Sequence, residues 1–114
     1  MTERIKNVNQ IEWGDDPRFP GVSLQLLISR DHTPAVSMLR VFVEEGAEIT
    51  THVHPTETEI IYVLAGQPVL TMQGTRHQLS AGGFAVIPSG IEHSLDNPNA
   101  ETVELMAIHS PPTR

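Results

Sequence analysis

The chain has 114 residues, of which 39% are hydrophobic and 18% are charged, and we expect one folded domain over residues 1–114. Its formal net charge of -7 argues against nucleic acid as a partner, because a nucleic-acid-binding protein needs clustered Lys and Arg on one face. The chain contains no cysteine, so disulfides and thiolate zinc sites are excluded, and any metal must bind to nitrogen and oxygen.

The N-terminal segment lacks the features of a secretory signal. Charges at Glu3, Arg4 and Lys6 replace the apolar region that such a signal requires. No window of the sequence approaches the length of a membrane span. We therefore expect a cytoplasmic protein that has no membrane partner.

Short apolar, β-branched segments alternate with turn residues along the chain, which is typical of a β-sandwich or barrel. Apolar Val22, Leu24 and Leu26 alternate as in a half-buried strand, and the strand predicted at 36–44 is apolar on both faces. No long window has helical periodicity with caps, so we expect an all-β protein with a loose tail at 110–114. The predicted strands are 8–13, 22–29, 36–44, 60–64, 69–72, 75–79, 84–87, 91–95 and 102–108.

Two histidines lie two positions apart, at His52 and His54. On a strand both imidazoles leave the same face and can share one ion. Glu59 follows after a break at Pro55, and the apolar run 60–64 predicts a second strand that returns beside the first. That return would bring Glu59 opposite the histidines. The alternative interpretation of such a histidine pair is an exposed polar face.

A third imidazole, His93, lies in a strand-like segment directly after a turn at residues 88–90. Three imidazole nitrogens and one carboxylate oxygen would suit a divalent first-row metal. The sequence contains no Ser, His and Asp set with useful spacing and no glycine-rich phosphate loop, so it offers no nucleophile triad and no phosphate-binding motif.

The spacing of these residues, together with the glycines and the proline around them, resembles the motifs of the cupin superfamily. The first cupin pattern, G-x5-H-x-H-x4-E-x6-G, is filled by residues 46–66, and the second, G-x5-P-x-G-x2-H-x3-N, by residues 82–97. The fixed positions are Gly46, His52, His54, Glu59, Gly66, Gly82, Pro88, Gly90, His93 and Asn97. We interpret the glycines, Pro88 and Asn97 as turn residues that act on the backbone.

The resemblance implies a single-domain antiparallel jelly-roll barrel, a double-stranded β-helix whose interior holds the metal. It implies His52, His54, Glu59 and His93 as metal ligands and one divalent ion per chain, which could be Fe, Mn, Ni or Zn. A homodimer is also expected, because small cupins pair their sheets or exchange an N-terminal strand.

Three functions are compatible with such a site, because fold does not fix function. The first is a metal-dependent oxidoreductase of dioxygenase type acting on an enol, enolate or carboxylate-bearing small molecule, in which Glu59 could also leave the metal and act as a base. The second is a non-redox isomerase, cyclase or decarboxylase. The third is a small-ligand-binding or sensing module without turnover.

Other residues are weaker candidates for the pocket. We expect Ile61 to face inward with Glu59, and Arg40 to bind substrate together with Met38 and Phe42 on its own face of a strand. Alternatively, Arg40 pairs with Glu44 or Glu48 at the surface. The aromatic residues Trp13 and Tyr62 are predicted to lie in the core or an interface, and the remaining histidines, His32, His77 and His109, to lie on the surface.

Overall fold

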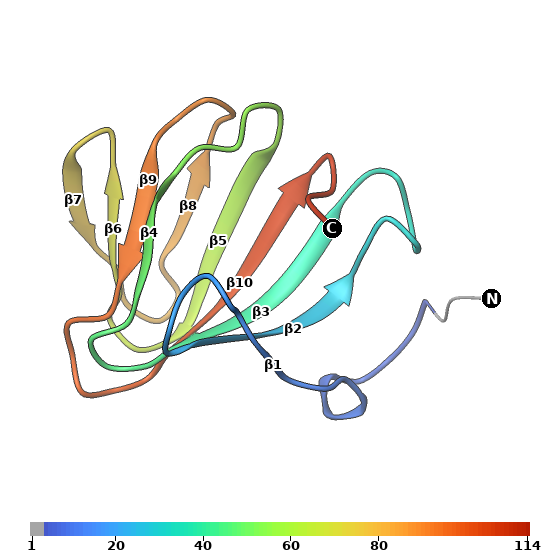
Figure 1. The fold of residues 1–114 in the computed structure, drawn as a ribbon, viewed down its shortest axis with the longest axis horizontal. Helices are drawn as coiled ribbons and strands as arrows, with labels where there is room; N and C mark the ends of the chain where they lie inside the picture. Colours follow the sequence, from blue (N-terminus) through green and yellow to red (C-terminus); the bar gives the residue numbers. More distant parts are fainter. Residues whose placement is uncertain (1–3) are drawn as a thin grey trace.

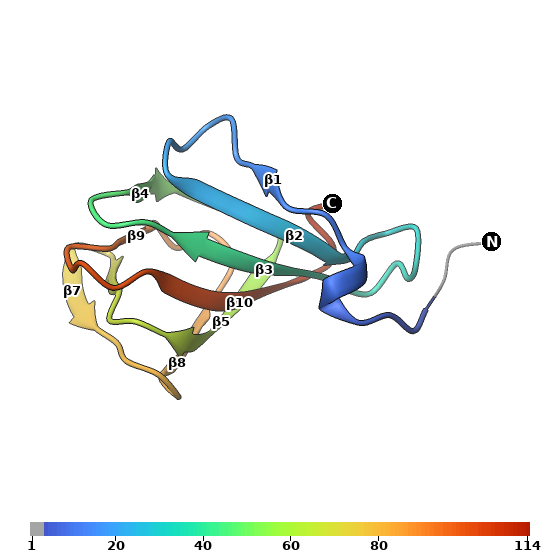
Figure 2. The same ribbon diagram turned by 90° about the horizontal axis from the view of Figure 1, so that it is seen from below.

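Two antiparallel β-sheets lie face to face in the computed structural model, which describes residues 4–114 (Figure 1). The six-stranded sheet has the order β1-β2-β3-β10-β5-β8, which Figure 2 shows from below, and the four-stranded sheet has the order β4-β9-β6-β7. The strands are β1 (Gly14–Asp15), β2 (Val22–Ile28), β3 (Ser37–Val43), β4 (Glu48–His52), β5 (Thr58–Ala65), β6 (Val69–Met72), β7 (Thr75–Gln78), β8 (Phe84–Ile87), β9 (His93–Asp96) and β10 (Val103–Ser110). This architecture confirms the predicted all-β jelly-roll fold.

Side-chain alternation explains how the longer strands are buried. In β5 the apolar residues Ile61 and Val63 point into the molecule with Glu59, whereas Ile60, Tyr62 and Leu64 are exposed on the outer face. The predicted division of this strand into two faces is confirmed. It gives Glu59 a position inside the sandwich, among buried aliphatic side chains.

The predicted first strand, residues 8–13, is wrong. Residues Val8–Gln10 form the 3-10 helix η1, because the Asn7 side chain accepts a hydrogen bond from the Asn9 amide and Gln10 caps in return. This segment packs on the outside of the large sheet, where the Gln25 side chain donates to the carbonyls of Val8 and Ile11.

The expected alternation in β2 holds through Leu26, because Val22, Leu24 and Leu26 are the register partners of inward-facing residues of β3. Leu26 is nonetheless partly exposed, and the polar Gln25, on the outer face, is buried under the N-terminal segment. The pairing of β2 with β3 shifts between Leu26 and Ile28, which marks a β-bulge. A bulge inserts an extra residue, so the simple two-residue period ends there.

The strands β4 and β5 do not lie beside each other, contrary to the predicted return. The connection at residues 53–57 crosses from one sheet to the other, so that β4 pairs with β9 while β5 pairs with β10 and β8. Glu59 therefore approaches the histidines across the space between the sheets.

The C-terminal tail is tied to the large sheet, which corrects the expectation of a loose segment at 110–114. The Thr113 amide donates to Ser37 Oγ at 3.0 Å, and the Arg30 amide donates to the Arg114 carbonyl at 2.8 Å. These bonds place the last residues against the start of β3.

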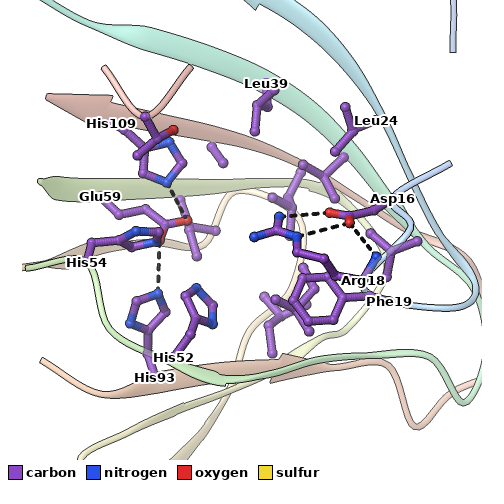
Figure 3. Close-up of a pocket in the computed structure, with 18 of the residues that line it drawn as sticks. Asp16, Arg18, Phe19, Leu24, Leu39, His52, His54, Glu59, His93 and His109 are labelled. Atoms are coloured by element: carbon purple, nitrogen blue, oxygen red, sulfur yellow. Dashed lines mark hydrogen bonds and ion pairs between the residues drawn. The ribbon is translucent and has the colours of Figure 1, made fainter. Parts of the chain in front are cut away.

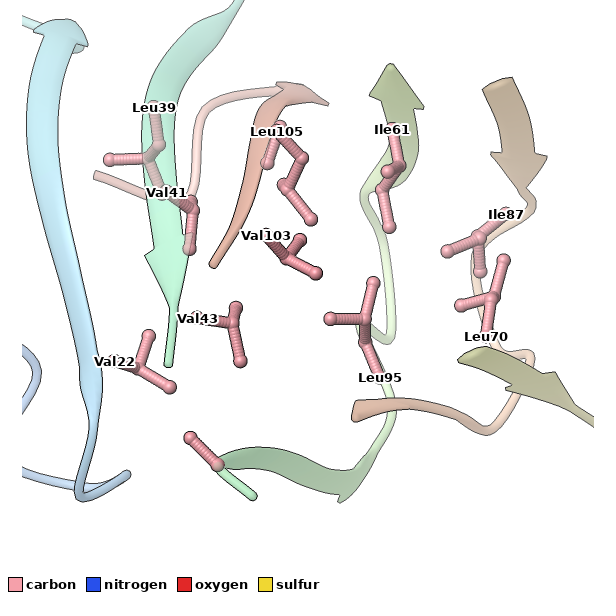
Figure 4. Packing of buried hydrophobic residues seen from close by; sticks show 12 residues of the cluster. Val22, Leu39, Val41, Val43, Ile61, Leu70, Ile87, Leu95, Val103 and Leu105 are labelled. Carbon is pink, nitrogen blue, oxygen red and sulfur yellow. The ribbon is translucent and has the colours of Figure 1, made fainter. Parts of the chain in front are cut away.

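The hydrophobic core fills the space between the two sheets (Figure 4). Both sheets contribute, with Val43 and Leu105 from the large sheet and Leu70 and Leu95 from the small one. The buried cluster is Val22, Leu39, Val41, Val43, Ala47, Ile61, Leu70, Ile87, Leu95, Val103, Leu105 and Ala107. Within residues 4–114, we find no helix with the length and apolarity needed to cross a membrane.

Candidate metal centre

The three motif histidines come from the small sheet and the loop beside it. His52 ends β4 and is the register partner of His93, which begins β9. His54 lies in the following loop, whose position is fixed because the Gly90 amide donates to the His54 carbonyl at 2.9 Å. The turn before His93 and the loop that carries His54 therefore hold each other in place.

Glu59 reaches this group from β5 in the opposite sheet (Figure 3). Its Oε1 lies 3.2 Å from His54 Nε2 and 3.0 Å from His93 Nε2. One potential ligand atom from each of His52, His54, Glu59 and His93 lies within 4.8 Å of all the others. The four side chains thus form a cluster that could hold a metal ion.

Backbone carbonyls fix the orientation of two of the imidazoles. His52 Nδ1 donates to the Thr50 carbonyl at 2.7 Å, and His93 Nδ1 donates to the Ile91 carbonyl at 3.0 Å. In a neutral ring this leaves Nε2 with a free lone pair. Such bonds are the usual means by which a protein orients a histidine ligand, so the donor set fits a first-row divalent ion.

Burial and hydrogen bonding together set the protonation of the groups in the cluster. Burial disfavours the charged Glu59 carboxylate, but hydrogen bonds with His109, His54 and His93 outweigh it and hold the pKa of Glu59 well below its usual range. Burial lowers the pKa of His52, which keeps this imidazole neutral. Burial also disfavours the charged form of His93, yet its hydrogen bond with Glu59 prevails and raises the pKa of His93, so a bound metal would compete with a proton there.

His109 is a buried member of this site, so its predicted surface position is wrong. Its Nε2 lies 3.5 Å from Glu59 Oε2, and among the described residues its Nδ1 has no hydrogen-bond partner. The residue ends the inward-facing row Val103, Leu105 and Ala107 on β10. That alternation was visible in the sequence and was the signal that could have identified His109.

A cavity of about 260 Å³ extends from the cluster between the sheets. Its walls are mainly aliphatic and include Ile61, in agreement with the position predicted for that side chain. Sequence reasoning missed a polar group that also lines it, formed by Asp16 and Arg18 from the loop between β1 and β2, together with Arg114.

Arg40, Met38 and Phe42 do not line this cavity, which corrects their predicted placement. Successive side chains of β3 alternate, and these three lie on the outer face while Leu39 and Val41 point inward. Arg40 forms an ion pair with Glu104 of the neighbouring strand instead of Glu44 or Glu48.

Neighbouring side chains on the outer face of the large sheet stabilise the charge of Arg40. Its guanidinium lies 5.5 Å from the Trp13 ring centre and 5.1 Å from that of Phe42, and it donates to Gln25 at 3.2 Å. Trp13 and Tyr62 are each 44% exposed, so neither belongs to the core.

The two histidines outside the site differ in exposure. His77 is exposed on β7, as predicted. His32 is half-buried and its Nδ1 accepts the Ser29 amide at 3.0 Å, so its description as a surface residue needs correction.

Comparison with known proteins identifies relatives for most of the chain. The family model for the cupin domain matches residues 39–109. Mannose-1-phosphate guanylyltransferase of Klebsiella pneumoniae is 32% identical over 68% of this chain, and the regulator PuuR of Escherichia coli is 30% identical over 82% of it. The chain spans only 17% and 50% of these proteins, respectively. An oxalate-binding protein of Thermotoga maritima is 29% identical over 76% of this chain and 74% of that protein.

Solved structures show the same architecture. A protein described as a predicted oxalate decarboxylase from Thermotoga maritima has a TM-score of 0.83 and 26% identity, covering 94% of this chain and 98% of that chain. An RmlC-like cupin from Shewanella frigidimarina has a TM-score of 0.85 and 22% identity, covering 99% of this chain and 95% of that one. At 22% identity, the similarity to the Shewanella frigidimarina protein concerns the fold alone.

Proposed function

Because the chain belongs to the cupin domain family, as the match over residues 39–109 shows, we propose that it binds one divalent transition-metal ion and uses it to act on a small organic molecule. The proposed ligands are His52, His54, Glu59 and His93. The convergence of these four side chains within 4.8 Å, at a cavity with largely aliphatic walls, carries the proposal. Their donors suit iron, manganese, nickel or zinc.

The proposed reaction class is that of a metal-dependent oxidoreductase of dioxygenase type. When bound, the ion would polarise a substrate oxygen as a Lewis acid and orient the reactants. Glu59 is held ionised by the surrounding imidazoles, so it can serve as a ligand or accept a substrate proton. Aliphatic walls from Leu39, Leu105 and Ile61 would exclude water from the bound substrate.

Similarity to Thermotoga maritima proteins favours a second candidate, in which the metal and a small carboxylate interact without redox chemistry. The Thermotoga maritima relatives are described as an oxalate-binding protein and a predicted oxalate decarboxylase. A non-redox decarboxylase, isomerase or cyclase, or a module that binds its ligand without turnover, would use the same cluster. Oxygen consumption with candidate substrates separates the first candidate from these, and retention of ligand without product identifies the binding module.

The test of the metal site is elemental analysis of protein purified without a metal-affinity tag. We expect about one equivalent of a divalent transition metal in the parent and under about a tenth in His52→Ala and His93→Ala, because each removes one of four ligands. His77→Ala is the matched control, since this exposed histidine lies outside the cluster and should leave the metal content unchanged. Absence of metal from the parent after reconstitution would overturn the proposal.

We further propose that two copies of the chain associate. The support is a set of exposed apolar side chains on the outer face of β5 and of the neighbouring strand β8, at one edge of the large sheet. Phe84 is 69% exposed and Val86 56%, and Ile60, Tyr62 and Leu64 lie beside them at about 40% exposure. A contiguous apolar surface of this kind gains free energy when a second copy covers it.

A further inference from the structure

One charged group in the cavity has no role in the metal site described above. Arg18 projects from the loop between β1 and β2, and its guanidinium points from Asp16 into the cavity, on the side facing the histidines (Figure 3). The cavity wall between this group and the cluster is largely aliphatic. The cavity therefore has a metal-binding cluster at one end and a cation at the other.

Asp16 fixes the direction of this guanidinium. Its Oδ1 accepts Arg18 Nε at 3.1 Å, its Oδ2 accepts Arg18 Nη2 at 3.0 Å, and its Oδ1 also accepts the Arg18 backbone amide at 3.0 Å. Asp16 is buried, whereas the Arg18 side chain is 62% exposed, so the carboxylate acts as the fixed partner. The ring of Phe19 supports the guanidinium at 4.9 Å.

The bond to Asp16 leaves the guanidinium able to bind a second acceptor. A guanidinium has five N–H donors, and Asp16 occupies only the edge formed by Nε and Nη2. In the described part of the chain Nη1 makes no hydrogen bond to protein. Arg114 lines the same cavity and lies near enough to help lower the pKa of Asp16, so two arginines face a single aspartate.

We propose that Arg18, oriented by Asp16, binds a carboxylate of the substrate while another oxygen of the same molecule reaches the metal site. This inference rests on the proposed function and narrows its substrate class to small organic acids with a second oxygen-bearing group. The cavity of about 260 Å³ lies below the roughly 300–1,000 Å³ of drug-sized ligand sites, which limits the acid to a short chain. The planar guanidinium favours a carboxylate because both have a fork geometry.

The test is calorimetric binding of a series of short hydroxy acids, from glycolate to 4-hydroxybutyrate, and of the corresponding hydroxy amides, to metal-loaded and metal-free protein. We expect at least one hydroxy acid to bind about tenfold more tightly than its amide, and Arg18→Gln to abolish this preference while binding of the amide stays unchanged. Arg18→Lys should restore part of it, because it keeps the charge and loses the fork. Arg76→Gln, on exposed β7, is the matched control.

The outcomes separate this inference from the proposed function. Equal binding of every hydroxy acid and its amide to the parent, or a preference that survives in Arg18→Gln, would show that Arg18 only pairs with Asp16 and would overturn the inference. Failure of the parent to take up metal would overturn the proposed function, and the carboxylate preference of the metal-free protein would then decide the role of Arg18. Unchanged metal content and a retained cooperative unfolding transition in Arg18→Gln exclude an indirect effect, since only the small contribution of the pair with Asp16 to stability should be lost.

Discussion

At the scale of single residues, Glu59 is the point on which the site converges. One of its oxygens faces His54 and His93, and the other faces His109. A carboxylate in this position is both a potential ligand and the acceptor that orients its neighbours. His109 consequently holds the second carboxylate oxygen, and its ring packs against that of His54 with the ring centres 4.9 Å apart.

Replacing His109 by alanine should weaken metal binding without abolishing it. We expect a loss of about 10–100-fold in metal affinity, because removal of a group that orients a ligand typically has this effect. Competition with a fluorescent chelator measures the affinity, with His77→Ala as the control. A loss as complete as that of His93→Ala would instead show that His109 is itself a ligand.

The pair of Asp16 and Arg18 should contribute to stability in a pH-dependent way. Burial acts to raise the pKa of Asp16, but its hydrogen bonds and ion pair with Arg18 outweigh burial and lower it. The folded state therefore binds this proton more weakly than the unfolded state, whose Asp pKa is about 3.9. The contribution is present above about pH 4 and is lost as the pH falls through the folded pKa.

Comparison of the parent with Asp16→Asn isolates this effect, since asparagine keeps the shape and can still accept the Arg18 amide. We expect a difference of about 1 kcal/mol or less in the free energy of unfolding at pH 7, because Arg18 is exposed and the pair is screened. Urea unfolding from pH 7 to pH 3 should show the difference shrinking below about pH 4. A difference that grew toward low pH would contradict the assignment.

At the scale of the elements, two glycines of the first motif show how turns fix the strands. Gly46 precedes β4 with a φ of +77°, and Gly66 follows β5 with a φ of +86°, a region that other residues rarely adopt. At Gly66 an added Cβ would lie 2.9 Å from the Thr102 carbonyl oxygen and from Val103 Cα, whereas at Gly46 it would meet no atom within 4 Å.

Alanine should therefore cost more at Gly66 than at Gly46. Gly46→Ala carries only the conformational cost, about 1–3 kcal/mol in the free energy of unfolding. Gly66→Ala carries the same cost plus that of the 2.9 Å contacts with the backbone of Thr102 and Val103. Chemical denaturation of both variants measures the difference, and equal losses would show that the chain near Val103 relaxes easily.

At the scale of the whole molecule, the exposed face of β5 and β8 determines the expected assembly. Phe84→Asp should weaken the proposed dimer by about 2 kcal/mol or more, because it places a charge in an apolar contact. Sedimentation at micromolar concentration should find the parent dimeric and the variant monomeric, while Phe84→Leu should stay dimeric. A monomeric parent, or a dimeric Phe84→Asp, would refute this interface.

The sequence by itself determined the fold class and the four residues of the candidate metal centre. The alternation of apolar side chains is a local property of each strand, and the spacing within residues 46–66 and 82–97 brings His52, His54, Glu59 and His93 into one pattern. The same alternation correctly placed Arg40 on one face with Met38 and Phe42. It could not say which face points inward, because β3 is apolar on both.

Only the tertiary structure decided the remainder of the site. The insertion of β10 between β3 and β5 brings His109 against Glu59, and the loop before β2 brings Arg18 to the cavity. These contacts depend on which strands pair over long separations and on where the chain crosses between the sheets. A local hydrophobic pattern specifies neither the strand pairing nor the crossing points. The free energy that selects them comes from packing the whole sandwich.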